Sequence, residues 1–474
     1  MPISRREFLG ALGAAGALAA TGGLRSAAKA APASGNGVNA VPLLRTTTSG
    51  VPTPEASGIE HIVVVMMENR SFDHFLGWMP GADGKQAGLT FQDSAGASHK
   101  THYLGTEYNG CSHPDPDHSY EGGRAQYDHG HMDGWLQKPS GDDDFALGYY
   151  LDTDRPFMSS LARTYTSCDR YFCSILAETY PNRFYMHAAK TDRLHNNGVA
   201  TTTLSPTIWD RLQAKGVSHR YYFSDIPFLA LWQTKYLSIC GHFAEFLVDA
   251  ATGQLPAVSF VDPRFLGETA LVDVGPNDTG GGISNDDHPH ADIRAGDNFL
   301  STIFYALANG PAWKNTALVI NYDEWGGFFD HVAPPRAAAS SPLDKDLVGG
   351  KALLGFRVPC IVASPWTMGD PGKPRVYGTP QHQTTPFDHT SVLKLIEWRH
   401  DLKPLTARDA SSDVGNILDV FDFSAHDASF PSWVPLVPPP LPDPCGPLNP
   451  SPLRDNAWAN LATSGLLKGW NLPK

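Results

Sequence analysis

Apolar residues gather in short runs along the chain, and two of these runs end abruptly in acidic and other polar side chains. The first, IVVVMM at residues 62–67, is followed by ENRSFDH at residues 68–74. The second, ALVINY at residues 317–322, is followed by DEWGGFFDH at residues 323–331. Strands that are apolar throughout are typical of parallel sheets covered on both faces, which place functional groups at their carboxyl edge. Both runs are therefore predicted to be buried strands that bring acidic groups to one edge of a sheet.

Further strands and helices alternate along the rest of the chain. Strands are expected at residues 257–263 and 358–366, and helices at residues 206–216, 296–309 and 388–400. This alternation predicts an α/β fold with a doubly wound, mostly parallel central sheet flanked by helices. The long loop-like text between the first strand and residue 160 predicts loop-rich insertions at the active edge of that sheet.

A candidate nucleophile lies in the segment RYFCSILAETYPNRFYMHAA, which begins at Arg170. Its pattern predicts a short apolar segment, a turn at residues 179–180 and a helix with Pro181 in its first turn. Thr179 would then lie at a helix N-terminus, where free backbone N–H groups and the helix dipole favour a phosphate. The alternative is that the Thr179 hydroxyl only caps the helix.

The polar ends of the two strands predict a metal site. Crowded carboxylates repel one another and would otherwise bind protons, so a hard cation is the simplest way to keep them ionised. The alternative is that Glu68 or Asp73 caps the helix that follows, because acidic residues are favoured at helix N-termini. An oxygen-rich set of ligands is compatible with calcium, magnesium, manganese, zinc or iron, so the identity of the single divalent ion stays open.

The N-terminal sequence predicts export. Residues 1–30 contain the pair Arg5 and Arg6, a weakly apolar Gly/Ala-rich segment and a small-x-small pattern, which together are typical of a twin-arginine signal peptide. The apolar segment is too short and too rich in glycine to span a membrane. We therefore expect contact with the twin-arginine translocation machinery and a periplasmic or extracellular location.

The remaining domain boundaries follow from composition. Residues 31–57 are rich in Pro, Ser, Thr and Gly and are predicted to be a flexible lead-in to a domain at residues 58–429. Residues 430–474 are predicted to be a tail packed on that domain, and its proline-rich part at residues 430–452 should be extended.

Charge and cysteine content exclude some classes of protein. The formal net charge is −13, and residues 1–30 contribute +3 to it, so the exported chain would carry about −16 and is not expected to bind nucleic acid. The six cysteines show neither a CxxC spacing nor a zinc-finger arrangement. Export permits disulfides, but Cys168 and Cys173 are equally compatible with small buried core residues.

Five segments together resemble the bacterial phospholipase C and acid phosphatase A phosphoesterase family, which includes plant non-specific phospholipases C. These segments are ENRSFDH, ETYPNRFY, DDHPHADIRAG at residues 286–296, YDEWGGFFDH and DHTSVLKLIE, and they occur in the expected order. The resemblance implies an alkaline-phosphatase-like fold, one metal ion and a phosphoesterase domain at residues 58–429.

The resemblance also assigns roles to individual residues. Thr179 occupies the nucleophile position and would form a phosphothreonine intermediate. The implied metal ligands are Glu68, Asn69, Thr179, Asp323 and Glu324. The implied acid–base residues are His118 and His288. The predicted substrate contacts are Asn69, His118, His288, His290 and His331, and the weaker candidates among the histidines are His290, His331 and His389. Tyr180, where many relatives carry a small or acidic residue, predicts a narrower pocket beside the leaving group.

The substrate is predicted less directly. The aromatic residues of segment 219–236 would suit a quaternary ammonium head group if they formed a cage, but such a run is more often core packing. Hydrolysis of phosphodiester bonds in phospholipids is the first interpretation. Broad phosphomonoester hydrolysis of the acid phosphatase type is the alternative, and a non-catalytic surface binding protein is a third hypothesis from a different class.

Overall fold

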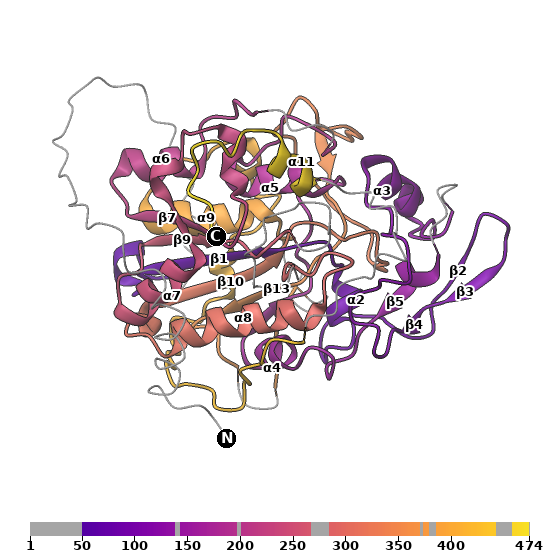
Figure 1. Ribbon diagram of the computed structural model, residues 1–474, viewed down its shortest axis with the longest axis horizontal. Coiled ribbons are helices and arrows are strands. Elements are labelled where there is room, and N and C mark those ends of the chain that lie inside the picture. The colour runs from indigo at the N-terminus through magenta and orange to yellow at the C-terminus, as the bar shows by residue number, and fades with distance from the viewer. Residues whose placement is uncertain are drawn as a thin grey trace.

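One eight-stranded sheet forms the centre of the molecule, with the strand order β14-β6-β13-β10-β1-β9-β7-β8 (Figure 1). The computed structural model describes residues 50–137, 143–196, 201–266, 284–369, 373–378, 385–441 and 457–473. The strands are β1 (His61–Met67), β6 (Thr166–Cys168), β7 (His219–Phe223), β8 (Cys240–His242), β9 (Val258–Val261), β10 (Thr316–Tyr322), β13 (Cys360–Ala363) and β14 (Arg375–Tyr377). Only β13 in this sheet is antiparallel to its neighbours, β10 and β6. The predicted α/β class with a mostly parallel sheet is confirmed.

Helices cover both faces of the sheet, as a doubly wound fold requires. One face carries α4 (Pro156–Thr164), α7 (Phe243–Thr252) and α8 (Ile293–Ala308), and the other carries α5 (Thr179–Ala188), α6 (Ile208–Lys215) and α9 (His389–His400) (Figure 1). The helices predicted at residues 206–216, 296–309 and 388–400 correspond to α6, α8 and α9. The remaining α-helices are α2 (Phe72–Leu76), α3 (Tyr120–Tyr127), α10 (Ala407–Ala410) and α11 (Ala457–Thr463).

Smaller elements fill the loops. Three two-stranded sheets pair β2 (Thr90–Gln92) with β3 (Ser98–Lys100), β4 (His102–Tyr103) with β5 (Gly148–Tyr149), and β11 (Arg336–Ala338) with β12 (Lys351–Leu353). Single 3-10 turns are η1 (Pro54–Ala56), η2 (Asp128–Gly130), η3 (Asp144–Leu147), η4 (Phe228–Trp232), η5 (Leu237–Ile239), η6 (Trp313–Asn315) and η8 (Ile417–Val420). The β2–β5 region and α3 extend from the side where β1 ends, at the right of Figure 1.

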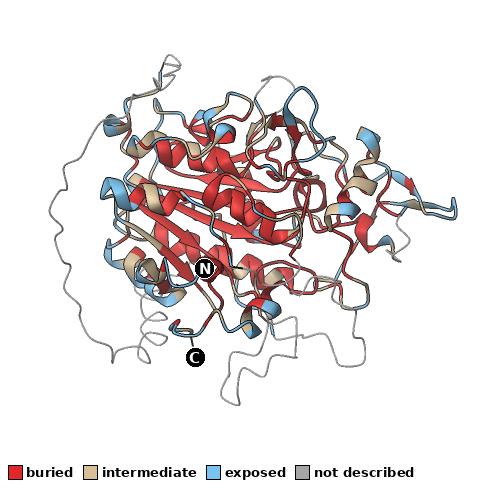
Figure 2. Cartoon of the chain, turned by 90° about the horizontal axis from the view of Figure 1, so that it is seen from above, coloured by how far each residue is buried: buried red, intermediate tan, exposed pale blue. Residues whose placement is uncertain are grey.

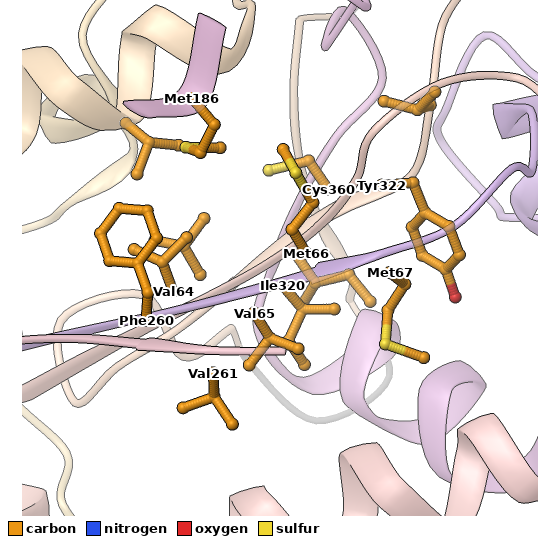
Figure 3. Close-up of a cluster of buried hydrophobic side chains, with 14 of the residues drawn as sticks. Val64, Val65, Met66, Met67, Met186, Phe260, Val261, Ile320, Tyr322 and Cys360 are labelled. Atoms are coloured by element: carbon orange, nitrogen blue, oxygen red, sulfur yellow. The ribbon is translucent and has the colours of Figure 1, made fainter. Parts of the chain in front are cut away.

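The register of β1 and β10 explains how the polar segments meet. Met67 at the end of β1 pairs with Tyr322 at the end of β10, so the residues that follow both strands leave the sheet at the same level. Successive side chains of β1 point to opposite faces: Val64 and Met66 face Met186 of α5, and Val65 lies on the other side (Figure 3). Both faces of β1 are therefore packed, in agreement with its unbroken apolar sequence, and the interior is buried as a whole (Figure 2).

The two ends of the chain are described only in part. Residues 1–49, on which the signal-peptide prediction and most of the predicted lead-in fall, lie outside the described residues. Residues 430–441 contain no helix or strand and bind α8, where the Tyr305 hydroxyl donates to the Val434 carbonyl at 2.8 Å. Residues 457–463 form α11, which the sequence analysis did not anticipate. Within the described part of the chain, no helix is both long and apolar enough to cross a membrane.

Candidate active site

The polar residues after β1 are tied directly to those after β10. The Asn69 backbone N–H donates to Asp323 Oδ1 at 3.1 Å, and the Arg70 N–H donates to the Glu324 carbonyl at 3.0 Å. Asn69 has a φ of 56°, in the left-handed region that asparagine tolerates better than most residues. A Cβ on Gly326 would lie 2.1 Å from the Asn69 carbonyl oxygen, so the glycine after the strand is required by this close approach.

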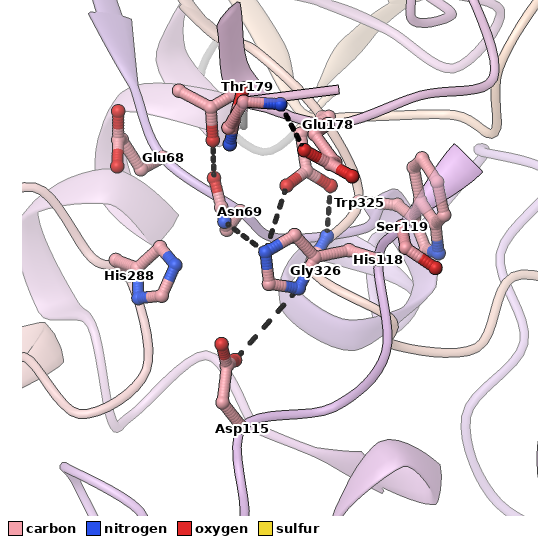
Figure 4. A network of polar contacts seen from close by, with 12 residues as sticks. Glu68, Asn69, Asp115, His118, Ser119, Glu178, Thr179, His288, Trp325 and Gly326 are labelled. Carbon is pink, nitrogen blue, oxygen red and sulfur yellow. Dashed lines mark hydrogen bonds and ion pairs between the residues drawn. The ribbon is translucent and has the colours of Figure 1, made fainter. Parts of the chain in front are cut away.

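Five oxygen-bearing side chains meet at this edge of the sheet, and all are fully buried. They are Glu68, Asn69, Thr179, Asp323 and Glu324. The Thr179 hydroxyl donates to Asn69 Oδ1 at 3.5 Å (Figure 4). Three segments far apart in the sequence therefore place their predicted site residues in one cluster, as the family resemblance implied.

Thr179 is the first residue of α5, and the helix cap is Glu178. The alternative that Thr179 is the N-cap residue is therefore wrong. The expected free N–H groups are also largely missing, because the Tyr180 N–H donates to Asn196 Oδ1 at 2.7 Å and Pro181 has no N–H. This end of α5 can therefore stabilise a bound anion mainly through the helix dipole. Hydrogen-bond donors for a phosphate must come from other elements.

Arg183, one turn further along α5, lies between two of the predicted metal ligands. Its guanidinium contacts Glu68 Oε1 at 2.9 Å and Asp323 Oδ2 at 3.1 Å, and it also reaches Asp262 Oδ1 at 3.4 Å. Sequence reasoning missed this residue, although its spacing of four from Thr179 places both on one face of the helix. One guanidinium thus faces several carboxylates in a buried site.

The electrostatics of the cluster fit a cation. Burial raises the pKa of Glu68 and Glu324 well above their usual values and also raises that of Asp323, while Arg183 acts in the opposite direction on Glu68 and Asp323. Among the described residues, Glu324 Oε1 has no hydrogen-bond partner, whereas its Oε2 accepts from the Gly326 N–H at 2.6 Å. Carboxylate, amide and hydroxyl oxygens are the ligands that hard divalent cations prefer, so the donor set fits the predicted metal.

His118 lies beside this cluster, in the loop before α3. Its Nδ1 donates to the Pro116 carbonyl at 2.8 Å, which leaves Nε2 directed toward the Asn69 amide at 3.4 Å and Glu324 Oε1 at 3.8 Å. The His118 and His288 rings are 5.6 Å apart and nearly perpendicular. Figure 4 shows Asn69 between Thr179 and His118, with Asp115 on the far side of the histidine. Asp115, His118 and His288 bring ligand atoms within 4.8 Å of one another, so a second group of side chains with metal-ligand spacing borders the oxygen cluster.

The position of His288 depends on two buried arginines. Its neighbour Asp287 accepts from the Tyr322 hydroxyl at 2.5 Å and pairs with Arg155 Nη2 at 2.8 Å, and Arg70 Nε donates to the Asp287 carbonyl at 2.6 Å. These contacts hold the 286–288 segment against the ends of β1 and β10. The predicted acid–base histidines His118 and His288 are therefore both placed at the oxygen cluster.

Comparison with known proteins identifies the group of enzymes. The model of the Phosphoesterase family matches residues 59–403. The chain belongs to this phosphoesterase family. Non-specific phospholipase C1 of Arabidopsis thaliana is 32% identical over 390 residues, which cover 74% of this chain and 69% of that protein. Phospholipase C B of Mycobacterium tuberculosis (strain ATCC 25618 / H37Rv) is 32% identical over 457 residues, which cover 81% of this chain and 82% of that protein.

These relatives are named as phospholipases C, and the phosphoesterase is accordingly a hydrolase that acts on phosphoric ester bonds. A solved structure from the alkaline phosphatase superfamily, from Vibrio parahaemolyticus, covers 55% of this chain and 63% of its own with a TM-score of 0.32 and 11% identity. A likeness of that size says nothing about the chemistry of the site.

The other predicted histidines of the phosphoesterase lie in different surroundings. His290 Nε2 donates to the His113 carbonyl at 3.0 Å. His331 Nδ1 binds Asp73 at 2.5 Å and its Nε2 binds Asp83 at 3.1 Å, so both ring nitrogens are engaged by carboxylates away from the oxygen cluster. This arrangement argues against the predicted substrate contact of His331.

Asp73 and His331 belong to a separate buried network around Arg357. The guanidinium of Arg357 pairs with Asp73 at 3.1 Å and with Asp330 at 2.9 Å. Asp73 also accepts from the Lys85 N–H, and the cap of α2 is Ser71, so the suggestion that Asp73 caps this helix is not what the structure shows. Glu68 does not cap it either, because it lies at the oxygen cluster.

The aromatic segment 219–236 is core packing in the phosphoesterase. Its predicted cage residues Tyr221, Tyr222, Phe223, Phe228, Trp232 and Tyr236 are all buried. The Phe228 ring packs against Phe184 of α5 and against His187, at 5.1 and 5.4 Å between centroids. The hypothesis that these side chains form an open cage for a quaternary ammonium group is wrong, because their faces are already covered.

Two further predictions concern Tyr180 and the cysteines. The Tyr180 side chain is fully buried and its hydroxyl donates to the Ala457 carbonyl at 2.7 Å, so it joins α5 to α11, and its effect on the width of the pocket stays a prediction. Cys168 and Cys173 are free and buried, which matches the core alternative. Cys111 is disulfide-bonded.

Proposed function

We propose that this phosphoesterase is an exported, metal-dependent enzyme that hydrolyses phosphodiester bonds of phospholipids through a phosphothreonine intermediate. The observation that carries the proposal is the Thr179 hydroxyl at the start of α5, hydrogen-bonded to Asn69 beside three buried carboxylates. A hydroxyl placed among groups that favour a cation is suited to nucleophilic attack on phosphorus.

One divalent cation supplies part of the chemistry in this proposal. When bound, it would lower the pKa of the Thr179 hydroxyl and offset the charge of the transferring phosphate; its ligands would be Glu68, Asn69, Thr179, Asp323 and Glu324. Arg183 supports the same role, because it orients two of these carboxylates through direct contacts.

In the first step a bond forms between Thr179 Oγ1 and phosphorus while the bond from phosphorus to the diacylglycerol oxygen breaks. The leaving alkoxide takes a proton from Nε2 of His118, and the proton lost from Thr179 passes through water to that nitrogen. His118 suits this role because its Nδ1 is already committed to the Pro116 carbonyl and only Nε2 faces the cluster.

In the second step water attacks phosphorus, the bond to Thr179 Oγ1 breaks, and the phosphorylated head group leaves. The proton of the attacking water passes to the histidine, which returns one proton to the Thr179 alkoxide. The Asn69 amide and His288 border the space beside Thr179 and supply contacts that the backbone N–H groups of α5 do not.

A phospholipid diester is preferred over a phosphate monoester on two grounds. Several relatives at about 30% identity are named as phospholipases C. A monoester dianion needs an additional cationic side chain, and Arg183 is already committed to Glu68 and Asp323. The nature of the head group is left open, because the aromatic segment 219–236 does not form a cage.

The test compares hydrolysis of p-nitrophenylphosphorylcholine with that of p-nitrophenyl phosphate, by mature wild-type protein and by Thr179→Ala, with the metal content measured on the same samples. A preference for the diester that is lost in the variant supports the proposal. A preference for the monoester would make the enzyme a phosphatase, and unchanged activity in Thr179→Ala would exclude Thr179 as the nucleophile.

We also propose export by the twin-arginine pathway to the periplasm or the medium, which rests on residues 1–30 alone. Replacing Arg5 and Arg6 by lysine is expected to retain the protein in the cytoplasm, as measured by cell fractionation and immunoblotting. Equal export of the variant and the wild type would exclude this pathway.

A further inference from the structure

A tryptophan from the C-terminal segment binds one of the predicted metal ligands. Trp458 lies in α11, 390 positions after Glu68 and beyond residue 403, where the family match ends. Its indole N–H is shared between the two carboxylate oxygens of Glu68, at 2.9 Å from Oε1 and 3.0 Å from Oε2. The C-terminal segment thus reaches the oxygen cluster that the N-terminal strand β1 delivers.

The direction of this N–H is set by packing on several sides of the indole ring. The ring stacks on Phe265 with centroids 3.6 Å apart and planes within 5°. Its edge contacts Tyr180 at 5.6 Å and Phe228 at 6.2 Å between centroids. The hydroxyl of Tyr180 also donates to the backbone of Ala457, so α5 and α11 are joined next to the ring. Figure 1 shows α11 beside α5.

The other contact of the Glu68 carboxylate shows what an indole N–H can add at this position. Arg183 contacts Oε1 of Glu68 and holds that oxygen from one direction. An indole N–H can only donate and carries no charge, so it restricts the rotation of the carboxylate without competing for a cation. Hydrogen bonds to a metal-binding carboxylate orient it, and their loss typically weakens metal binding or activity by about 10- to 100-fold.

We propose that Trp458 is a positioning residue of the active site, which fixes the Glu68 carboxylate in the orientation that binds the divalent cation. The proposal rests on the proposed metal-dependent phosphoesterase function and adds to it a residue of the C-terminal segment. It also explains why α11 is packed against α5 and Phe265 at this place: these contacts orient the Trp458 indole N–H toward the Glu68 carboxylate.

The experiment measures the dissociation constant of Mn²⁺ and of Zn²⁺ for full-length mature protein by chelator competition, together with kcat and KM for p-nitrophenylphosphorylcholine. Trp458→Phe keeps an aromatic ring and removes the N–H. The matched control is Trp470→Phe, because Trp470 lies in the same segment, is equally buried at 7% exposure, and has an indole N–H without a hydrogen-bond partner among the described residues.

We expect Trp458→Phe to weaken metal binding by about 10- to 100-fold, to lower activity at limiting metal, and to recover most of kcat at saturating metal. Trp470→Phe should bind metal as the wild type does, even though both variants lose ring volume in the same segment. Equal metal affinity in the two variants would overturn the proposal.

A second variant decides the question if Trp458→Phe does not fold. Phe265→Leu keeps the indole N–H but removes the ring on which Trp458 stacks, and it should weaken metal binding in the same direction by a smaller factor. Unchanged affinity in that variant would overturn the proposal. A wild-type protein that is active without any metal would instead refute the proposed function, so the two failures are distinguishable.

Discussion

Removal of Arg183 is expected to be among the most destabilising single changes at the active site. The guanidinium is 1% exposed and lies within 3.1 Å of both Glu68 and Asp323, which are fully buried. Loss of one partner of a buried ion pair leaves an uncompensated charge and typically costs about 3–5 kcal/mol. Arg183→Met keeps most of the side-chain volume, so this loss of charge compensation should dominate over packing effects.

The magnitude can be measured as a change in melting temperature. With an unfolding entropy of about 2.1 cal/mol/K per residue, a loss of 3–5 kcal/mol over 474 residues lowers Tm by about 3–5 °C. The assay is calorimetry on the apo protein in the presence of a chelator. Added divalent cation should recover part of the loss, because positive charge then returns to the same carboxylates.

The matched control is Arg163→Met. Arg163 pairs with Asp152 at 2.7 Å, a distance similar to those of Arg183, but both side chains are more than a third exposed. A solvent-exposed pair is screened and contributes about 0–1 kcal/mol, so the control should shift Tm by 1 °C or less. Equal shifts in the two variants would refute the reasoning that burial of the Arg183 network determines its contribution.

Three further predictions concern the glycine turn, a buried histidine and the proton donor. Gly326→Ala should abolish activity and lower Tm, because the new Cβ would lie 2.1 Å from the Asn69 carbonyl oxygen. The control is Gly350→Ala, where the new Cβ would have open space around it and only the strain of the positive φ should lower the stability. Burial lowers the pKa of His389 from 6.5 to about 4, so the unfolded chain binds this proton at a higher pH than the folded chain does. The stability that the neutral ring contributes is complete above pH 6.5, and ~3 kcal/mol of it is lost as the pH falls to 4. In urea titrations His389→Gln should lack this part of the acid destabilisation, and identical pH profiles for the variant and the wild type would contradict the prediction. His118→Gln should lower kcat for alkyl phosphodiesters by about 10²–10⁴-fold. It should lower kcat for p-nitrophenyl esters much less, since p-nitrophenolate leaves without a proton. Equal losses of kcat for the two classes of ester would exclude His118 as the proton donor.

Local sequence was sufficient to predict the central strands and the motifs at their ends. The run at residues 62–67 is apolar on both faces, and β1 has both faces packed, because a strand between two helical layers buries its side chains on both sides and is therefore mostly apolar. The short strands β6, β8 and β14, two of which form the edges of the sheet, were not predicted. Three-residue strands carry too little periodic pattern to be distinguished from loops.

Interactions over long sequence distances were the part that the sequence did not reveal. Arg183 was missed because nothing in the local sequence marks a helical arginine as the partner of carboxylates 115 and 140 positions away. The aromatic segment 219–236 was ambiguous for the same reason. A run of aromatic residues has the same composition in a ligand cage as in a core, and only the elements packed against it decide which one it forms.

The sequence by itself determined the fold class, the two acidic strand ends and the resemblance to the phosphoesterase family, since these depend on periodicity and on contiguous motifs. The tertiary structure alone decided which side chains share one buried volume. In the folded chain Arg183 and Trp458 bind Glu68, and His331 lies in a separate ion-pair network. The physical reason is that hydrogen bonds and ion pairs depend on the distance in space between two groups, and chain folding makes that distance independent of their separation in sequence.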